Sequence, residues 1–216
     1  MVRQPTTGEK VPFTNKQMIS SPYILLISAW IFFGVSHSVL ASGSVKRIAV
    51  KMMGRGYKYY RAIYSLIATV TLLILLHYHF SCADTILWRV PLIEKAIATL
   101  CILSGLVIMA ICIRKYFLDL SGIHAIMGIS RPLVLQETGM HAYVRHPLYF
   151  GTLLFVWGIF MGYPYWNNLV SCICLTLYIL IGIYFEEKKL ELEYGDVYKK
   201  YHVVVPALFP DNFKKD

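Results

Sequence analysis

The chain has 216 residues, of which 57% are apolar and only 15% are charged, and its mean hydropathy is +0.56. This length suits a single domain, and the composition excludes an ordinary soluble protein. The formal net charge of +9 would fit a nucleic-acid-binding protein, but in a membrane chain basic residues mark the cytoplasmic loops. We therefore expect one membrane domain over residues 1–216 and no nucleic-acid partner.

Five apolar segments have about the length that is needed to cross a bilayer core of roughly 30 Å. They are Tyr23–Ser42, Ala62–Phe80, Ile93–Ile113, Pro147–Tyr165 and Leu169–Phe185. The first three form an N-terminal part over residues 23–113, and the last two predict a hairpin whose turn carries interfacial aromatic residues. Small residues near the end of the first segment resemble a signal-peptidase site, but the segment's length and His37 favour a retained span. The sequence predicts an all-α bundle of about five transmembrane helices in the lipid bilayer.

The basic residues are distributed unevenly between these segments. The loop of residues 43–61 holds six Lys or Arg and no acid, whereas the N-terminal tail holds three. The connection between the last two segments has no charge. By the positive-inside rule, we predict the N-terminus outside, and the C-terminal tail and the segment of residues 114–146 in the cytoplasm.

The tail after Phe185 has apolar residues at helical spacing, at positions 190, 194, 197, 198 and 201. This pattern predicts a cytoplasmic amphipathic helix that is either broken at Gly195 or continuous through it, and that ends before Pro206. A helix lying on the membrane surface would show the same pattern.

Other features predict packing rather than chemistry. Gly158 and Gly162 form a GxxxG pattern, which allows close helix approach. The cysteines have no CxxC spacing, so neither a disulfide framework nor a zinc site is indicated. His77 and His79 do not share a helix face, and we predict no metal site. We expect His37 to be hydrogen-bonded within the bundle, and the role of His124 stays open.

Charged residues flank the predicted hairpin at both ends. Arg145 and His146 precede Pro147, which suits the first turn of a helix, and a helix N-terminus attracts anions. Glu186 and Glu187 close the fifth segment, where acids oppose the helix dipole. Charge at the mouth of a membrane hairpin is costly, so it normally has a ligand or a partner. The residues alone leave both a functional role and simple interfacial anchoring open.

The first motif reads Arg145-His146-Pro147-x-Tyr149-x-Gly151, and the second runs from Glu186-Glu187 through Tyr194-Gly195 to Pro206. Over residues 131–210 the chain resembles the isoprenylcysteine carboxyl methyltransferase superfamily, which includes phospholipid methyltransferases and bacterial methanethiol S-methyltransferases. In the N-terminal part, Ser36-His37-Ser38 and Tyr60-Arg61-x-x-Tyr64 are more similar to the methanethiol methyltransferase and NnrU-like branches.

The resemblance implies S-adenosylmethionine (SAM) as the cofactor, bound on the cytoplasmic side, and Arg145, His146 and Glu187 as the catalytic residues. The implied cofactor contacts are Leu133, Val134, His141, His146, Pro147, Leu148, Tyr149, Glu186 and Glu187. Arg131 and His141 stand where the isoprenylcysteine enzymes have a histidine and a tyrosine. In this reading Arg145 and His146 bind the methionyl carboxylate, and one of the two glutamates binds the amino group or the ribose.

The acceptor is less closely defined. The isoprenylcysteine enzymes carry an arginine about four residues before the key glutamate, facing the acceptor carboxylate, and residues 180–185 hold none. Because a buried, unpaired carboxylate is costly, we favour a small or lipophilic thiol over prenylcysteine, with a phospholipid amine still open. His37 or His141 is the candidate base for a thiol. One alternative function is that of a non-catalytic NnrU-like membrane protein or transporter. Another is an NADPH-dependent sterol reductase, which is less favoured because such proteins have more spans than the five expected here.

Overall fold

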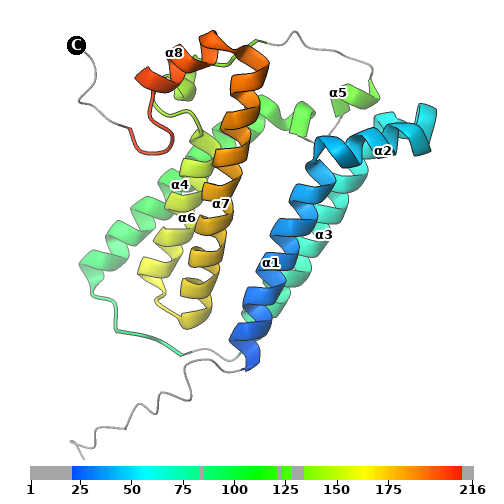
Figure 1. Cartoon of the computed structure of the whole chain (residues 1–216). Helices are drawn as coiled ribbons and strands as arrows, with labels where there is room; N and C mark the ends of the chain where they lie inside the picture. The colour runs from blue at the N-terminus through cyan, green and yellow to red at the C-terminus, as the bar shows by residue number, and fades with distance from the viewer. Residues whose placement is uncertain (1–20, 83–84, 121–122, 128–133, 211–216) are drawn as a thin grey trace, which may run out of the picture.

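The computed structural model describes residues 21–82, 85–120, 123–127 and 134–210, and the regular elements in these ranges are all helical. In chain order they are α1 (Ser21–Ala41), α2 (Gly43–Met53), η1 (Gly54–Tyr59), α3 (Tyr60–Ser81), α4 (Leu92–Leu120), α5 (Ile123–Ile126), η2 (Gly139–Ala142), α6 (Pro147–Gly162), α7 (Trp166–Tyr194) and α8 (Asp196–Val204). Figure 1 shows α1 and α3 as one antiparallel pair beside a group formed by α4, α6 and α7. The predicted all-α membrane bundle is confirmed.

Four helices are long and apolar enough to cross a membrane, namely α1, α3, α4 and α7. The fourth predicted span is shorter than expected: α6 has 16 residues, and at 1.5 Å per residue it reaches about 24 Å. Within α6 only Met161 is exposed, because α4 and α7 pack along it. A helix enclosed by protein does not need to match the thickness of the lipid.

Glycines allow α4 and α6 to pack closely. A Cβ atom on Gly105 of α4 would lie 2.7 Å from the carbonyl oxygen of Gly151 on α6, so the two backbones meet at this point. Further along α6, added Cβ atoms on Gly158 and Gly162 would lie 3.0 Å and 3.2 Å from the Cβ atoms of Cys101 and Ala98 on α4. The predicted packing role of this GxxxG pair is confirmed.

Buried polar groups connect α1 and α3 to α7. The indole N–H of Trp30 donates to the Ser171 hydroxyl at 2.9 Å, and His79 lies 3.0 Å from the same hydroxyl. His79 thus joins a hydrogen-bonded network, and no cluster of metal-ligating side chains occurs in the described ranges. The Nδ1 atom of His37 is buried without a hydrogen-bond partner, so the hydrogen bond expected for this residue is not made at that atom.

The two ends of the bundle carry different chain segments. At one end the Tyr78 hydroxyl donates to the carbonyl of Pro22, and Ile86 forms a bridge with Tyr165. At the other end lie α2, α5 and α8 (Figure 1). The basic segment that contains α2 therefore shares one end of the molecule with α5 and α8.

Candidate functional site

The second motif lies inside a long helix and not at a helix end. Helix α7 continues past Glu186 and Glu187 to Tyr194, and Gly195, with φ of 57°, separates it from α8. The expectation that the two acids close a helix and oppose its dipole was therefore wrong. Of the two alternatives that the sequence left open at Gly195, the structure shows the break, and few residues other than glycine adopt this backbone conformation.

The chain after α8 returns to the start of α6. The backbone N–H of Arg145 donates to the carbonyl of Pro206 at 2.9 Å, and that of His146 donates to the carbonyl of Ala207 at 3.0 Å. The Tyr201 hydroxyl on α8 donates to the carbonyl of His141 at 2.6 Å. These bonds fix α8 across the segment that leads into α6.

An ion pair joins the two motifs. The Nε and Nη2 atoms of Arg145 donate to Oε1 of Glu187 at 2.8 and 2.6 Å, and the two side chains are only 8% and 19% exposed. The Nη1 atom donates to the carbonyl of His202 at 2.9 Å and also to the carbonyl of Val205. The Arg145 guanidinium therefore links α7, α8 and the entry to α6.

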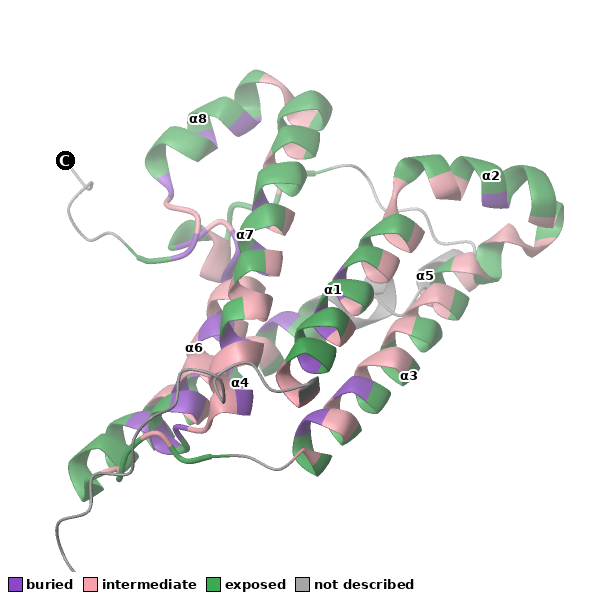
Figure 2. Ribbon diagram, turned by 60° about the horizontal axis from the view of Figure 1, so that its bottom comes forward, coloured by how far each residue is buried: buried purple, intermediate pink, exposed green. Residues whose placement is uncertain are grey.

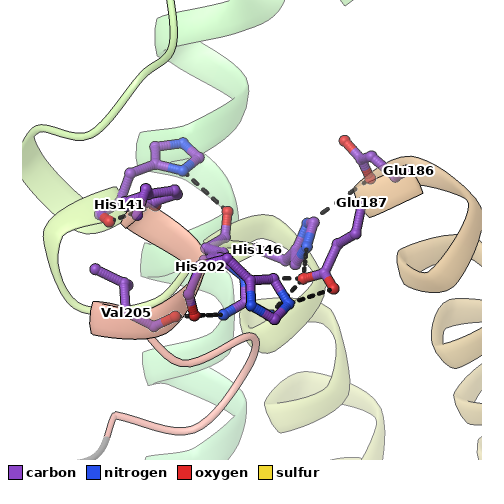
Figure 3. Close-up of polar contacts among 8 residues, drawn as sticks. His141, His146, Glu186, Glu187, His202 and Val205 are labelled. Atoms are coloured by element: carbon purple, nitrogen blue, oxygen red, sulfur yellow. Dashed lines mark hydrogen bonds and ion pairs between the residues drawn. The ribbon is translucent and has the colours of Figure 1, made fainter. Parts of the chain in front are cut away.

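Two histidines complete the surroundings of Glu187 (Figure 3). The Nε2 atom of His146, which is buried, lies 3.1 Å from Oε1 of Glu187, and Nε2 of His202 lies 3.4 Å from Oε2. The other ring nitrogen of His146 is 3.7 Å from Glu186, whose side chain is 44% exposed. Glu187 is thus enclosed by cationic or hydrogen-bonding groups, whereas Glu186 is more accessible.

A cavity of about 340 Å³ opens beside this cluster. Its volume falls in the range of small-molecule and cofactor pockets. It is lined by Cys112, Val134, Leu135, Gln136, His141, Arg145, His146, Pro147, Leu148, Tyr149, Glu186, Leu190, Tyr194, Tyr198 and Tyr201. Four parts of the fold contribute to it: α4, the segment before α6, the first turn of α6, and α7 with α8.

Two of the lining groups outside the spans are neutral near pH 7. Burial lowers the pKa of His141, and its Nδ1 lies 3.0 Å from the carbonyl oxygen of Arg145. Because a carbonyl only accepts, Nδ1 carries the hydrogen and Nε2 carries the lone pair. Burial raises the pKa of Tyr198 to about 12, so its phenol stays protonated.

The structure brings nearly all the predicted site residues together. Val134, His141, His146, Pro147, Leu148, Tyr149 and Glu186 line the cavity with Arg145, and Glu187 lies behind them in the ion pair. Leu133 and Arg131 lie outside the described residues, as does the side chain of His124.

Sequence reasoning missed the cavity residues Leu135, Gln136 and Cys112, which no local pattern indicates, and also the side chains from α7 and α8. For the side chains from α7 and α8 the sequence did contain a signal, namely the helical spacing of Leu190, Tyr194, Tyr198 and Tyr201. That spacing predicts one sheltered face, but it does not distinguish a face that lies on lipid from one that covers a cavity.

The sequence matches known proteins over most of its length. Residues 25–205 match the model of the NnrU protein family. The chain is 29% identical over 204 residues to the methanethiol S-methyltransferase of Pseudomonas deceptionensis, which covers 88% of this chain and 74% of the relative. The corresponding protein of Mycobacterium tuberculosis is 29% identical over 185 residues, with 82% and 74% covered. Methanethiol S-methyltransferase 1 of Bradyrhizobium diazoefficiens is 27% identical, and the match spans 82% of this chain and 63% of that relative. The comparison with solved structures found no match.

Proposed function

The chain belongs to the NnrU family, and from its cavity we propose that it is a membrane-embedded, SAM-dependent methyltransferase that acts on a small thiol. The observation that carries this proposal is that residues of both motifs line one cavity. Relatives named methanethiol S-methyltransferase support the transfer of a methyl group to sulfur.

The side chains around the cavity have the chemistry that SAM requires. When bound, SAM supplies a methyl group on a positively charged sulfur. The accessible carboxylate of Glu186 suits the ammonium group of its methionyl part. The backbone N–H groups in the first turn of α6, at Leu148 and Tyr149, have no intrahelical partner and suit its carboxylate. The rings of Tyr198 and Tyr201 offer faces for the adenine.

Arg145 and Glu187 take a different part in this proposal from the one that the resemblance implies. The Arg145 guanidinium already donates to Glu187 and to two backbone carbonyls, so few of its donors remain for a methionyl carboxylate. We therefore assign the pair a positioning role, in which it holds α8 and the start of α6 in place. His146 connects the pair to Glu186 and stacks on Tyr149, with ring centroids 5.6 Å apart.

A thiol acceptor has to lose its proton when sulfur is methylated. His141 lines the cavity, is neutral near pH 7, and carries its lone pair on Nε2. In our proposal Nε2 of His141 takes this proton, while the Nδ1–H bond to the Arg145 carbonyl fixes the ring. Only apolar, tyrosine and glycine residues stand at positions 180–185, so no cation there would pair an acceptor carboxylate.

The product of the reaction tests the proposal. Purified protein in detergent is incubated with methyl-labelled SAM and, separately, an alkanethiol, N-acetylated farnesylcysteine or phosphatidylethanolamine. We expect label on the alkanethiol far above that on the other two, because an unmatched buried polar group typically costs roughly 10⁴-fold in discrimination. Label mainly on farnesylcysteine or phospholipid would contradict the thiol. Absence of both SAM binding and labelled product would support the non-catalytic alternative.

Binding of the cofactor is tested at Glu186. We expect Glu186→Gln to weaken SAM binding about 10-fold or more, since a charge-assisted hydrogen bond contributes roughly 1.5–3 kcal/mol. Calorimetry measures this loss. Glu193→Gln removes an equal charge from the exposed part of the same helix and leaves the cavity lining intact, so its affinity should equal that of the wild type. Equal affinities in both variants would remove Glu186 from the site.

A further inference from the structure

Helix α2 belongs to the segment that connects two helices able to span the membrane. Helix α1 ends at Ala41 and α3 begins at Tyr60, and both are long and apolar enough to span a bilayer. The Tyr60 hydroxyl donates to the carbonyl of Leu40 at 2.7 Å, so these two helix ends are held together at one level. The segment between them, α2 and η1, must therefore leave and re-enter the membrane on the same side.

Different sides of α2 meet different surroundings. Ala49 is buried against the protein, whereas most of the helix is exposed (Figure 2). Ile48 and Met52, four residues apart and thus on one side, are 55% and 81% exposed. Arg47 and Lys51 form the next side and are also exposed. An exposed apolar side beside a cationic side is typical of helices that lie in the lipid headgroup layer.

Further cations and aromatic rings continue this surface into η1. Arg55 and Lys58 are exposed, and the Nζ atom of Lys58 lies 4.9 Å from the centre of the Tyr59 ring. Tyrosines at this level are typical of the membrane interface. Among the described residues, no acid lies within ion-pair distance of any cation in the segment of residues 43–61.

Cations from other helices approach the same region. Lys46 lies within electrostatic range of Lys189 on α7 and of Arg61 on α3. Like charges gathered from three helices repel one another unless an outside anion neutralises them.

We infer that α2 and η1 form a binding surface for anionic phospholipid headgroups, with Ile48 and Met52 inserted among the lipid chains and Arg47, Lys51 and Arg55 on the phosphates. An anionic leaflet supplies negative charge beside these cations, and it also explains the exposed apolar residues, which a soluble anion would leave in water. The inference does not depend on the proposed methyl transfer, since the surface is separate from the cavity lining.

Lipid composition around the protein tests this surface. The full chain is placed in membranes of phosphatidylcholine and phosphatidylglycerol, extracted with its surrounding lipid into polymer nanodiscs, and its lipids are quantified. We expect phosphatidylglycerol to be enriched over the bulk membrane. We also expect the α2 amides to exchange hydrogen more slowly in the mixed lipid than in phosphatidylcholine alone. High salt should abolish both effects, because it shortens the electrostatic screening length to about 3 Å at 1 M.

Three matched variants separate charge from folding. Each cation near an anionic surface contributes about five-fold to the affinity for anionic lipid, so Arg47→Gln/Lys51→Gln/Arg55→Gln should remove most of the enrichment. Arg47→Lys/Lys51→Arg/Arg55→Lys keeps the charge and should keep the enrichment. Lys199→Gln/Lys200→Gln removes exposed charge from α8 and should change nothing. Equal enrichment in the glutamine variant and the wild type would overturn the inference, as would loss of enrichment in the charge-conserving variant.

Discussion

The side chain of Arg145 makes its contacts with groups that lie 42 to 60 residues further along the chain. It donates to Glu187 and to the backbone carbonyls that end α8, and both members of the ion pair are largely shielded from water. Removal of one member of such a pair leaves a buried charge without its partner, which is the costly case. The pair should therefore matter more for the integrity of the site than an exposed pair of the same composition.

This residue-scale expectation can be measured with a double-mutant cycle. Arg145→Met should destabilise the protein by roughly 3 kcal/mol, because Glu187 loses its strongest partner. Arg145→Met/Glu187→Met should be more stable than the sum of the two single losses predicts, by at least about 1 kcal/mol. Unfolding in detergent, followed by circular dichroism, gives these free energies.

The exposed pair of Lys199 and Asp196 on α8 is the control for this cycle. Its Nζ–Oδ1 distance is 3.3 Å, but its side chains are 59% and 88% exposed. Lys199→Met should therefore cost less than about 1 kcal/mol. A cost for Arg145→Met as small as this would show that the buried pair does not hold the site together.

At the scale of the elements, the contact between α4 and α6 is made by backbone atoms. A Cβ atom on Gly105 would lie 2.7 Å from both the carbonyl oxygen of Gly151 and the amide nitrogen of Phe155, and the backbone has little freedom to give way. Helix α6 carries Leu148 and Tyr149 in its first turn, and α4 carries Cys112. A wider spacing of these two helices would therefore change the cavity as well as the packing.

We expect Gly105→Ala to destabilise the protein by roughly 1–3 kcal/mol, as is typical when extra atoms are forced into a packed interface. Gly182→Ala is the matched control, because a Cβ on Gly182 in α7 would meet nothing within 4 Å. That change should be neutral or stabilising, since alanine favours a helix over glycine by up to about 1 kcal/mol. Thermal unfolding in detergent compares the two. A neutral Gly105→Ala would mean that the helices can separate without cost.

At the scale of the whole molecule, the cavity lies at the end of the bundle that carries the basic segment. The loop of residues 43–61 has six Lys or Arg, and α8 lies at the same end (Figure 1). The other end carries the short connections that contain Arg89 and Tyr163, and these hold few charges. The positive-inside rule then predicts that the cavity opens to the cytoplasm.

Cysteine labelling of intact cells tests this orientation. On a cysteine-free background, Arg89→Cys and Lys200→Cys are both exposed positions at opposite ends of the bundle. We expect an impermeant thiol reagent to label Arg89→Cys in intact cells and to label Lys200→Cys only after the membrane is opened. The reverse pattern would move the cavity to the outer side. Labelling of both variants from one side would contradict a chain that crosses the membrane three times, in α4, α6 and α7, between these two positions.

The class of protein and the approximate extent of its helices could be predicted from the amino-acid sequence alone. Lipid excludes unpaired backbone groups, so a run of apolar residues has few alternatives to a helix, and hydropathy alone finds it. The first motif could also be recognised in the sequence, because the residues from His146 to Tyr149 are contiguous and Pro147 indicates where α6 begins. The GxxxG spacing of Gly158 and Gly162 likewise predicted a close contact, although not that α4 is the partner.

The contacts between the residues of the site could not be predicted in this way, because they depend on how the chain folds. The local pattern placed Glu187 at a helix end, whereas α7 runs on to Tyr194, and the turn at Gly195 then brings α8 back over the site. Hydropathy could not show this, because α7 continues beyond its apolar segment and its last turns have the polar composition of an unstructured tail. The pairing of Arg145 with Glu187, and the place of Tyr198 and Tyr201 at the cavity, depend on where that turn directs the chain. Contacts between residues far apart in the sequence produce no local periodicity, so they could not be predicted from sequence patterns.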